Sequence, residues 1–165
     1  EKSHVSTAMN QFTTVAQNMT SLFQGGFGIN NPPCTPAPCD FTAQAITLKI
    51  IPLWMQTSAT QANTPWNSSG FHLWWVANNP RTYRVAFYGV SRTGCLGLIE
   101  QTGGCTPGQP GCPTSVGTGG NTTTAPTAGN TRTAGTITSA DATALCAANA
   151  YPAGANNSVE FTLIQ

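Results

Sequence analysis

The chain has 165 residues, the size of one domain, and only 7% of them are charged, with a formal net charge of +1. An ordinary soluble protein has about 25% charged residues, and so few basic residues exclude both a phosphate-neutralising nucleic-acid face and a polybasic membrane-surface helix. Uncharged polar residues take the place of Lys and Glu. Because net charge near zero promotes association, we expect a protein that assembles or works outside the cytoplasm.

The first predicted element is an amphipathic helix from Val5 to Phe23. Its apolar positions follow a 4-3-4-3-4 spacing, which keeps them on one side of a helix, and Gly25-Gly26 provides the stop signal. The opposite side carries Ser, Thr, Gln and Asn. No N-cap residue precedes the helix, so we expect a longer helix of which this is the later part; a core helix that begins here is the alternative. The predicted stripe consists of Val5, Met9, Phe12, Ala16, Met19 and Phe23.

Residues 26–39 are rich in Gly and Pro and predict a loop. Asp40 then offers a start signal for a short helix over residues 41–51, which Pro52 ends. The alternation of Ile46, Leu48 and Ile50 would also suit a strand. We favour the helix, because an Ala-rich stretch is poor strand material.

Two aromatic and β-branched segments, Phe71–Val76 and Tyr83–Val90, predict an antiparallel hairpin joined by a longer loop. Alternation places one row of each strand on a shared face, and we expect these rows to meet the N-terminal helix. Trp74 and Tyr88 then lie on the far face, available to a loop, another subunit or a ligand. The rows are Phe71, Leu73 and Trp75 on the first strand and Tyr83, Val85 and Phe87 on the second.

The last third of the chain alternates helical, irregular and strand patterns. A short helix over residues 93–101 is expected after a Ser/Thr cap, followed by a low-complexity loop over residues 103–136. Residues 139–148 predict a second helix with Ser139 as its cap and Asp141 in its first turn. Residues 158–164 predict a strand with Val159, Phe161 and Leu163 on one face. This order predicts an α+β fold, one long helix packed on one antiparallel sheet.

Six cysteines lie among Gly, Pro and Thr residues, and their spacing lacks the paired units of a zinc site. We therefore expect three disulfides and an oxidising compartment. Fifteen connectivities exist, and the sequence alone does not choose among them. Closure of short loops favours two local pairs and leaves the third pair distant in sequence: Cys34 with Cys39, Cys105 with Cys112, and Cys95 with Cys146.

Few residues could carry out catalysis. The two histidines are His4 and His72, of which the second lies in a predicted strand and is expected to be structural. No nucleophile elbow, zinc-protease motif or phosphate-binding loop occurs, and we expect no enzyme activity, no metal and no cofactor. The carboxylates are isolated in sequence: Asp40, Glu100, Asp141 and Glu160.

The tryptophans offer an alternative function. Exposed indole rings on a β-rich secreted scaffold could stack on sugar rings, which would make the chain a carbohydrate-binding or adhesin module. The competing interpretation is that most of them fill the core. The four are Trp54, Trp66, Trp74 and Trp75.

Several motifs in a fixed order resemble type IV pilins, and most closely the type IVb branch. The segment Val5–Gly25 resembles the exposed half of the pilin N-terminal helix. Residues 51–55 and the run Thr64-Pro65-Trp66-Asn67-Ser68-Ser69-Gly70 resemble the entry to the pilin sheet, although the plain Gly-Gly form is absent. The surroundings of Cys95 and Cys146, with residues 157–162, resemble the cysteine pair around the variable region and the closing strand. The other two cysteine pairs have no counterpart in the family.

The resemblance implies one pilin domain over residues 1–165, with the rest of the N-terminal helix at 1–24, an αβ-loop at 25–65, and the sheet with the disulfide-stapled variable region at 66–165. It also implies a leader and an apolar half-helix ahead of Glu1, which anchors the subunit in the inner membrane before assembly. The expected function is a structural pilus subunit on the bacterial surface that polymerises through its N-terminal helix, with the apolar stripe as the assembly face. Copies of itself and the pilus assembly machinery are the expected partners. Receptors on host cells, phages or other bacteria are further expected partners.

Overall fold

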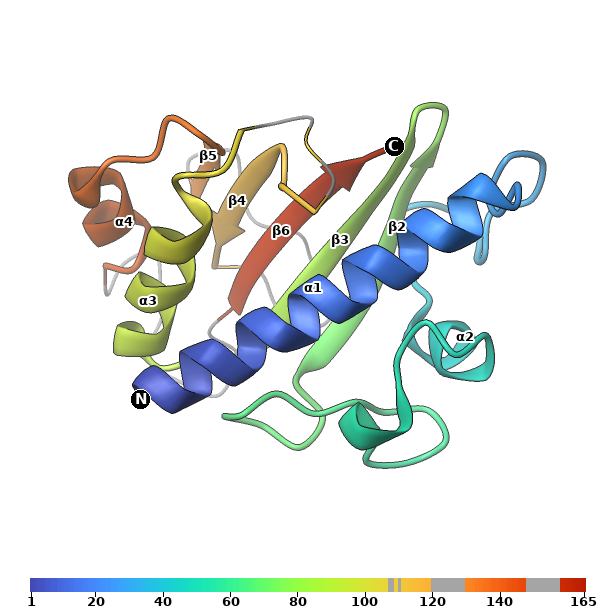
Figure 1. Ribbon diagram of the computed structural model, residues 1–165, viewed down its shortest axis with the longest axis horizontal. Helices are drawn as coiled ribbons and strands as arrows, with labels where there is room; N and C mark the ends of the chain where they lie inside the picture. The colour runs from blue at the N-terminus through green and yellow to red at the C-terminus, as the bar shows by residue number, and fades with distance from the viewer. Residues whose placement is uncertain (107–108, 110, 120–129, 148–157) are drawn as a thin grey trace.

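The computed structural model describes residues 1–106, 109, 111–119, 130–147 and 158–165. One long helix, α1 (Lys2–Gln24), crosses one face of a six-stranded antiparallel sheet. Helix α3 (Arg92–Thr102) packs against the first half of α1, and α4 (Ser139–Leu145) packs against α3 (Figure 1). Helix α2 (Thr42–Thr47) lies on the other side of α1. The predicted α+β architecture is therefore confirmed.

The sheet has the order β1-β2-β3-β6-β4-β5. The last strand of the chain thus lies between β3 and β4 and joins the hairpin to the C-terminal half of the sheet. Phe161 of β6 meets Phe12 of α1 with ring centroids 5.0 Å apart. The strands are β1 (Cys39–Asp40), β2 (Phe71–Asn78), β3 (Arg81–Tyr88), β4 (Ser115–Thr118), β5 (Thr131–Thr133) and β6 (Ser158–Ile164).

Helix α1 begins and ends close to the predicted positions. Gly25 is its C-cap, and the guanidinium of Arg81 donates hydrogen bonds to the carbonyls of Phe23 and Phe27, at 3.1 and 2.9 Å. The same guanidinium lies 4.6 Å from the centre of the Phe23 ring. Arg81 therefore joins the end of α1 to the start of β3. Among the described residues, no helix is long and apolar enough to cross a membrane.

The predicted hairpin is confirmed, with Phe71 opposite Phe87. The predicted longer loop is wrong: β2 continues to Asn78 and β3 begins at Arg81, so Asn79 and Pro80 alone form the turn. The two predicted apolar rows are buried and face α1, where Phe23 contacts the rings of both strands.

The expected helix after Asp40 is present but shorter than predicted. The carboxylate of Asp40 accepts hydrogen bonds from the backbone N–H and the hydroxyl of Thr42, at 2.9 and 2.6 Å, which starts α2. Lys49 then adopts a φ of 61°, which ends the helical path and turns Ile50 and Ile51 into the core. The loop prediction for residues 26–39 missed β1, which pairs Cys39 with Trp75.

The expected helix near Cys95 is confirmed as α3, and Ser91 caps it by accepting a hydrogen bond from the N–H of Gly94. The loop prediction for residues 103–136 was incomplete, because β4 and β5 lie within it. They form by pairing with β6 and with each other rather than through a local pattern. Thr138, not Ser139, caps α4, in a capping box with Asp141. The predicted last residue of this helix, Ala148, lies outside the described residues.

Candidate functional site

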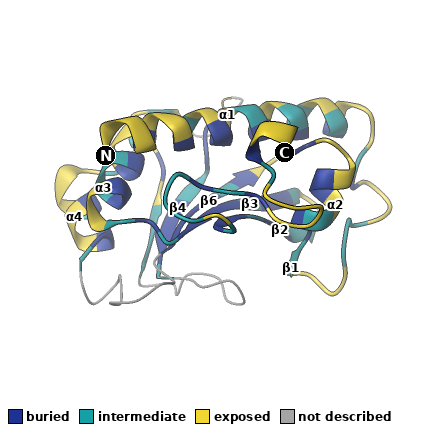
Figure 2. Ribbon diagram, turned by 90° about the horizontal axis from the view of Figure 1, so that it is seen from below, coloured by how far each residue is buried: buried dark blue, intermediate teal, exposed yellow. Residues whose placement is uncertain are grey.

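The surface of α1 has two distinct sides. The predicted stripe faces the sheet, with Met9 partly buried and the other five residues buried. Figure 2 shows that the exposed side points away from the sheet. A neighbouring chain could therefore reach the polar side and not the stripe, while assembly through α1 stays a prediction. The exposed polar residues of α1 are Lys2, Ser3, His4, Ser6, Thr7, Asn10, Thr13, Gln17, Ser21 and Gln24.

Two amides of α1 hold the αβ-loop against the helix. The Nε2 of buried Gln11 donates to the backbone carbonyl and to the side-chain oxygen of Asn63, at 3.0 and 3.1 Å. The Nδ2 of Asn18 donates to the carbonyl of Ile50 at 2.9 Å. Because buried amides need partners, these bonds fix the position of the loop beside the helix.

The start of α1 is joined to the entry of the sheet and to α3. The Glu1 carboxylate accepts a hydrogen bond from the indole N–H of Trp66, at 2.9 Å, and another from the Ser91 hydroxyl. These hydrogen bonds lower the pKa of Glu1. A Cβ at Gly97 would lie 2.8 Å from a methyl group of Val5, so the absence of a side chain lets α3 approach α1 closely.

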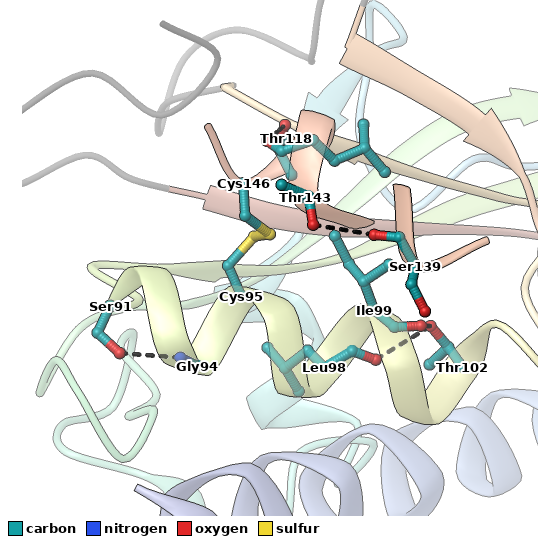
Figure 3. The surroundings of a disulfide bond; sticks show 11 residues. Ser91, Gly94, Cys95, Leu98, Ile99, Thr102, Thr118, Ser139, Thr143 and Cys146 are labelled. Atoms are coloured by element: carbon teal, nitrogen blue, oxygen red, sulfur yellow. Dashed lines mark hydrogen bonds between the residues drawn. A yellow bond between two sulfur atoms is a disulfide. The ribbon is translucent and has the colours of Figure 1, made fainter. Parts of the chain in front are cut away.

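All three expected disulfides are present, with the expected pairing. Cys95 in α3 is bonded to Cys146 directly after α4, and both are buried. Figure 3 shows that Ile99, one turn after Cys95, points to the same side of α3 as this bond. The bond closes the segment 95–146, which we call the disulfide-bounded region. Thr118 of β4 donates a hydrogen bond to the carbonyl of Leu145 at 2.7 Å and ties the end of α4 to the sheet.

On the sheet, His72 of β2 lies between two acceptors. Its Nδ1 is 2.6 Å from a carboxylate oxygen of Asp40, and its Nε2 is 3.0 Å from the carbonyl of Ser69. Burial acts to raise the pKa of Asp40, but hydrogen bonds from His72 and Thr42 outweigh it and leave the pKa below its ordinary value. Because both ring nitrogens are occupied, His72 has the structural role that we expected.

Tyr88 and Glu160 form a second polar pair, on the face of the sheet opposite to α1. The Tyr88 hydroxyl donates to Glu160 at 3.0 Å and accepts from the indole N–H of Trp74 at 3.1 Å. Burial raises the pKa of Glu160 to about 7, and burial with the nearby carboxylate raises the pKa of Tyr88. Tyr88 is itself buried, so the prediction that it is available to a ligand is wrong.

Sequence reasoning treated the carboxylates as isolated and missed both pairs. Asp40 meets His72 because β1 pairs with β2, and Glu160 meets Tyr88 because β6 pairs with β3. Neither pairing has a local signal. The available clue was the alternation of the predicted last strand, which places Glu160 on the face opposite to its apolar residues.

The tryptophans are divided between core and surface. Trp75 is fully buried against Phe23, Phe27 and Phe41. Trp66 and Trp74 are partly buried, and each donates its indole N–H within the subunit. Trp54 is thus the most exposed of the four side chains, which weakens the prediction of a tryptophan-based sugar platform.

Within the described residues, no three His, Cys, Asp or Glu side chains are grouped in a way that could hold a metal ion. Glu100 and Asp141 also lie outside the two polar pairs: Glu100 is exposed on α3, and Asp141 accepts from Arg132 at 3.4 Å. The arrangement supports surfaces for contact with other molecules more than it supports a reaction centre.

No family model and no curated protein matches the sequence. Among solved structures, the crystal structure of TcpA, a type IV pilin from Vibrio cholerae El Tor biotype, matches with a TM-score of 0.50. The match covers 93% of this chain and 98% of that chain, at 13% sequence identity. The chain has the type IV pilin fold. Both the α1–sheet layers and the disulfide-bounded region belong to this pilin fold, since the match covers nearly the whole chain.

Proposed function

We propose that the chain is the globular head of a type IVb pilus subunit. The observation that carries the proposal is the pilin fold over 93% of the chain. The subunit polymerises through its N-terminal helix and through contacts between heads, and its role is structural rather than catalytic. In the cell it resides in the inner membrane before assembly and on the bacterial surface afterwards.

The surface of the head supports this function. The exposed side of α1 is almost uncharged, so neighbouring heads would pack with little electrostatic repulsion. The three disulfides suit an extracellular filament. We propose that the filament supports adhesion, aggregation or conjugative contact, with the assembly machinery and cell-surface receptors as partners.

Two measurements test this function. Sequencing of the coding region upstream of Glu1 should find a Gly-ended leader and a long apolar run, whereas a conventional secretory signal would contradict the proposal. Immunogold electron microscopy with antibodies raised against residues 1–165 should label thin filaments along their length. Label confined to the cell body, with no filament decorated, would also contradict it.

A further inference from the structure

A polar pocket lies where the β2–β3 turn, the loop after α1 and the end of β6 come together. Its volume is about 420 Å³, within the range of about 300–1,000 Å³ that is usual for ligand sites. Figure 1 shows the β2–β3 turn, the C-terminal end of β6 and the end of α1 at one end of the molecule. We call this the turn pocket, and its lining residues are Ile29, Asn78, Asn79, Pro80, Arg81 and Gln165.

Arg81 is the only charged side chain among these lining residues. It has no ion pair among the described residues. The chain has five acidic side chains, and none of them lines the pocket. Glu100 is exposed on α3, and the other four accept hydrogen bonds elsewhere in the fold: Glu1, Asp40, Asp141 and Glu160. The turn pocket therefore carries a positive charge that no acidic side chain neutralises.

The guanidinium of Arg81 is held in place by the protein. Its Nη1 donates hydrogen bonds to the carbonyls of Phe23 and Phe27, and the group also lies against the Phe23 ring. Among the described residues, Nε and Nη2 have no hydrogen-bond partner. A guanidinium is planar and presents its donors as a rigid fork, so these two nitrogens can bind both oxygens of one carboxylate.

Asn78 adds a second oriented donor to the pocket. Its Oδ1 accepts a hydrogen bond from the indole N–H of Trp75 at 3.0 Å. Because Trp75 is fully buried, this bond fixes the orientation of the amide. The NH₂ group of Asn78 has no partner among the described residues, and such a group only donates. The free nitrogens of Asn78 and Arg81 together favour a negatively charged ligand that accepts hydrogen bonds.

The rim of the turn pocket suits a sugar ring beside that negative charge. Asn79 and Gln165 are exposed, and an amide offers both donors and an acceptor, which hydroxyl groups can use. Ile29 is 57% exposed and provides an apolar surface for the C–H groups of a ring. A simple anion would leave this rim unused, whereas a carboxylated sugar contacts the donors and the rim together.

From these observations we infer that the turn pocket binds a carboxylated sugar, either a uronic acid or a sialic acid, at the end of a surface glycan. The carboxylate binds Arg81 and Asn78, and the ring hydroxyls bind Asn79 and Gln165. The inference rests on the proposed pilus function and specifies the chemistry of a receptor for the filament. It does not depend on a tryptophan platform, since none of the four tryptophans lines the pocket.

Nuclear magnetic resonance titration of the chain tests the site directly. D-glucuronate and N-acetylneuraminate are added separately, with glucose as the neutral control and acetate and inorganic phosphate as simple anions. At least one acidic sugar should cause saturable shifts of the Arg81 Nε–H and Asn78 side-chain signals, with an affinity about fivefold to tenfold above that of acetate. Absence of these shifts would overturn the site, and equal affinity for acetate or phosphate would overturn its assignment to a sugar.

Variants then test the residues of the pocket. Asn79→Asp adds a negative charge at the rim and should lower the affinity for the acidic sugar about twofold to fivefold. Asn10→Asp is the matched control, because Asn10 is exposed on α1 and lies outside the pocket. An equal loss of affinity in both variants would show an effect of net charge alone and overturn the site.

Arg81→Lys keeps the positive charge but lacks the fork, so it should lower the affinity about tenfold. Urea unfolding shows whether this variant is folded, because Arg81 also joins α1 to β3. If it is not folded, the comparison of Asn79→Asp with Asn10→Asp decides the proposal. Unchanged affinity in a folded Arg81→Lys chain would overturn the assignment of the carboxylate to Arg81.

Failure of this inference is distinguishable from failure of the proposed function. Filaments visible by electron microscopy, together with a chain that binds neither acidic sugar, would overturn the sugar site and leave the pilus function intact. Absence of filaments from cells that express the unaltered gene would contradict the pilus function, while the titration of the isolated chain would still decide the sugar site.

Discussion

The helix-on-sheet half and the disulfide-bounded region are stabilised in different ways. The hairpin segment 71–90 contains six aromatic residues, and most of its inward-facing side chains are fully buried under α1. The disulfide-bounded region contains no aromatic residue and is rich in Gly and Thr. Its buried apolar residues are mainly small or aliphatic, such as Leu98, Val116 and Ala142. Apolar burial thus stabilises the first half, and the second half depends more on its cross-link.

The largest loss of stability is expected from a core substitution in the helix-on-sheet half. Trp75→Ala should lower the free energy of unfolding by about 3–5 kcal/mol, because it leaves a cavity among Phe23, Phe27 and Phe41. Urea unfolding followed by circular dichroism measures the change. Trp54→Ala is the matched control, because this exposed residue should change the stability by less than about 0.5 kcal/mol. Equal losses in the two variants would contradict the assignment of Trp75 to the core.

The second largest loss of stability is expected from removing the disulfide of the disulfide-bounded region. The Cys95–Cys146 bond spans 51 residues, and its replacement by Cys95→Ala with Cys146→Ala should cost about 4 kcal/mol in the chain-entropy account. The Cys34–Cys39 bond spans 5 residues, and its removal should cost about 2 kcal/mol. Unfolding by urea under non-reducing conditions compares the two double variants. A larger loss from the short loop would show that loop length does not control this stabilisation.

The third effect concerns pH. Because the pKa of Glu160 is raised to about 7 in the folded chain, the folded state holds its proton more tightly than the unfolded state. The stabilisation is complete below the unfolded pKa of about 4.5 and is lost as the pH rises through about 7. The parent should therefore lose roughly 2 kcal/mol of stability between pH 5 and pH 8 from this group.

Glu160→Gln should remove most of that pH dependence, because Gln keeps an acceptor for the Tyr88 hydroxyl and cannot ionise. Thermal unfolding at several pH values gives the comparison. Asp40 acts in the opposite sense: its lowered pKa contributes stability above its unfolded pKa of about 3.8, which is lost as the pH falls through the folded pKa. Asp40→Asn should therefore lower the stability at neutral pH and change its slope with pH only in the acid range. An unchanged slope between pH 5 and pH 8 in Glu160→Gln would contradict the buried position of Glu160.

The smallest effect concerns the start of α3, the helix that leads into the disulfide-bounded region. Ser91 caps α3, so Ser91→Ala should lower the free energy of unfolding by about 1 kcal/mol. Thr93→Ala is the control, because Thr93 is exposed and is not the cap residue. Ser91→Ala is then introduced into the double variant that lacks the Cys95–Cys146 bond. If it lowers the free energy of unfolding there by much more than about 1 kcal/mol, the cap and the disulfide stabilise α3 together.

The local patterns of the sequence predicted the strongly amphipathic elements well. Helix α1 and strand β6 carry regular apolar spacing, and the structure places both close to the predicted positions. The weakly apolar segments were predicted less well. Strands β4 and β5 have a Gly/Thr-rich sequence without a clear alternation, so only the pairing of β4 with β6 and of β5 with β4 reveals them.

The surfaces of the molecule also divide into one that the sequence predicts and one that it does not. The uncharged side of α1 follows from the sequence, because helical spacing separates it from the apolar stripe. The exposure of Leu53 and Trp54 does not follow from the sequence, since both residues would suit a core as well as a surface. Ile50, Ile51 and Met55 of the same segment are fully buried in the core, whereas Leu53 and Trp54 stay exposed.

The sequence by itself determined the α+β class, the long amphipathic helix and the hairpin, because each depends on residues close together in the chain. It favoured one disulfide pairing among fifteen, and the structure decided for that pairing. The tertiary structure alone decided that β6 lies between β3 and β4, which brings Glu160 to Tyr88. It also decided which apolar residues stay exposed. These outcomes depend on contacts between segments that are distant in the sequence, and no local sequence pattern indicates how favourable such contacts are.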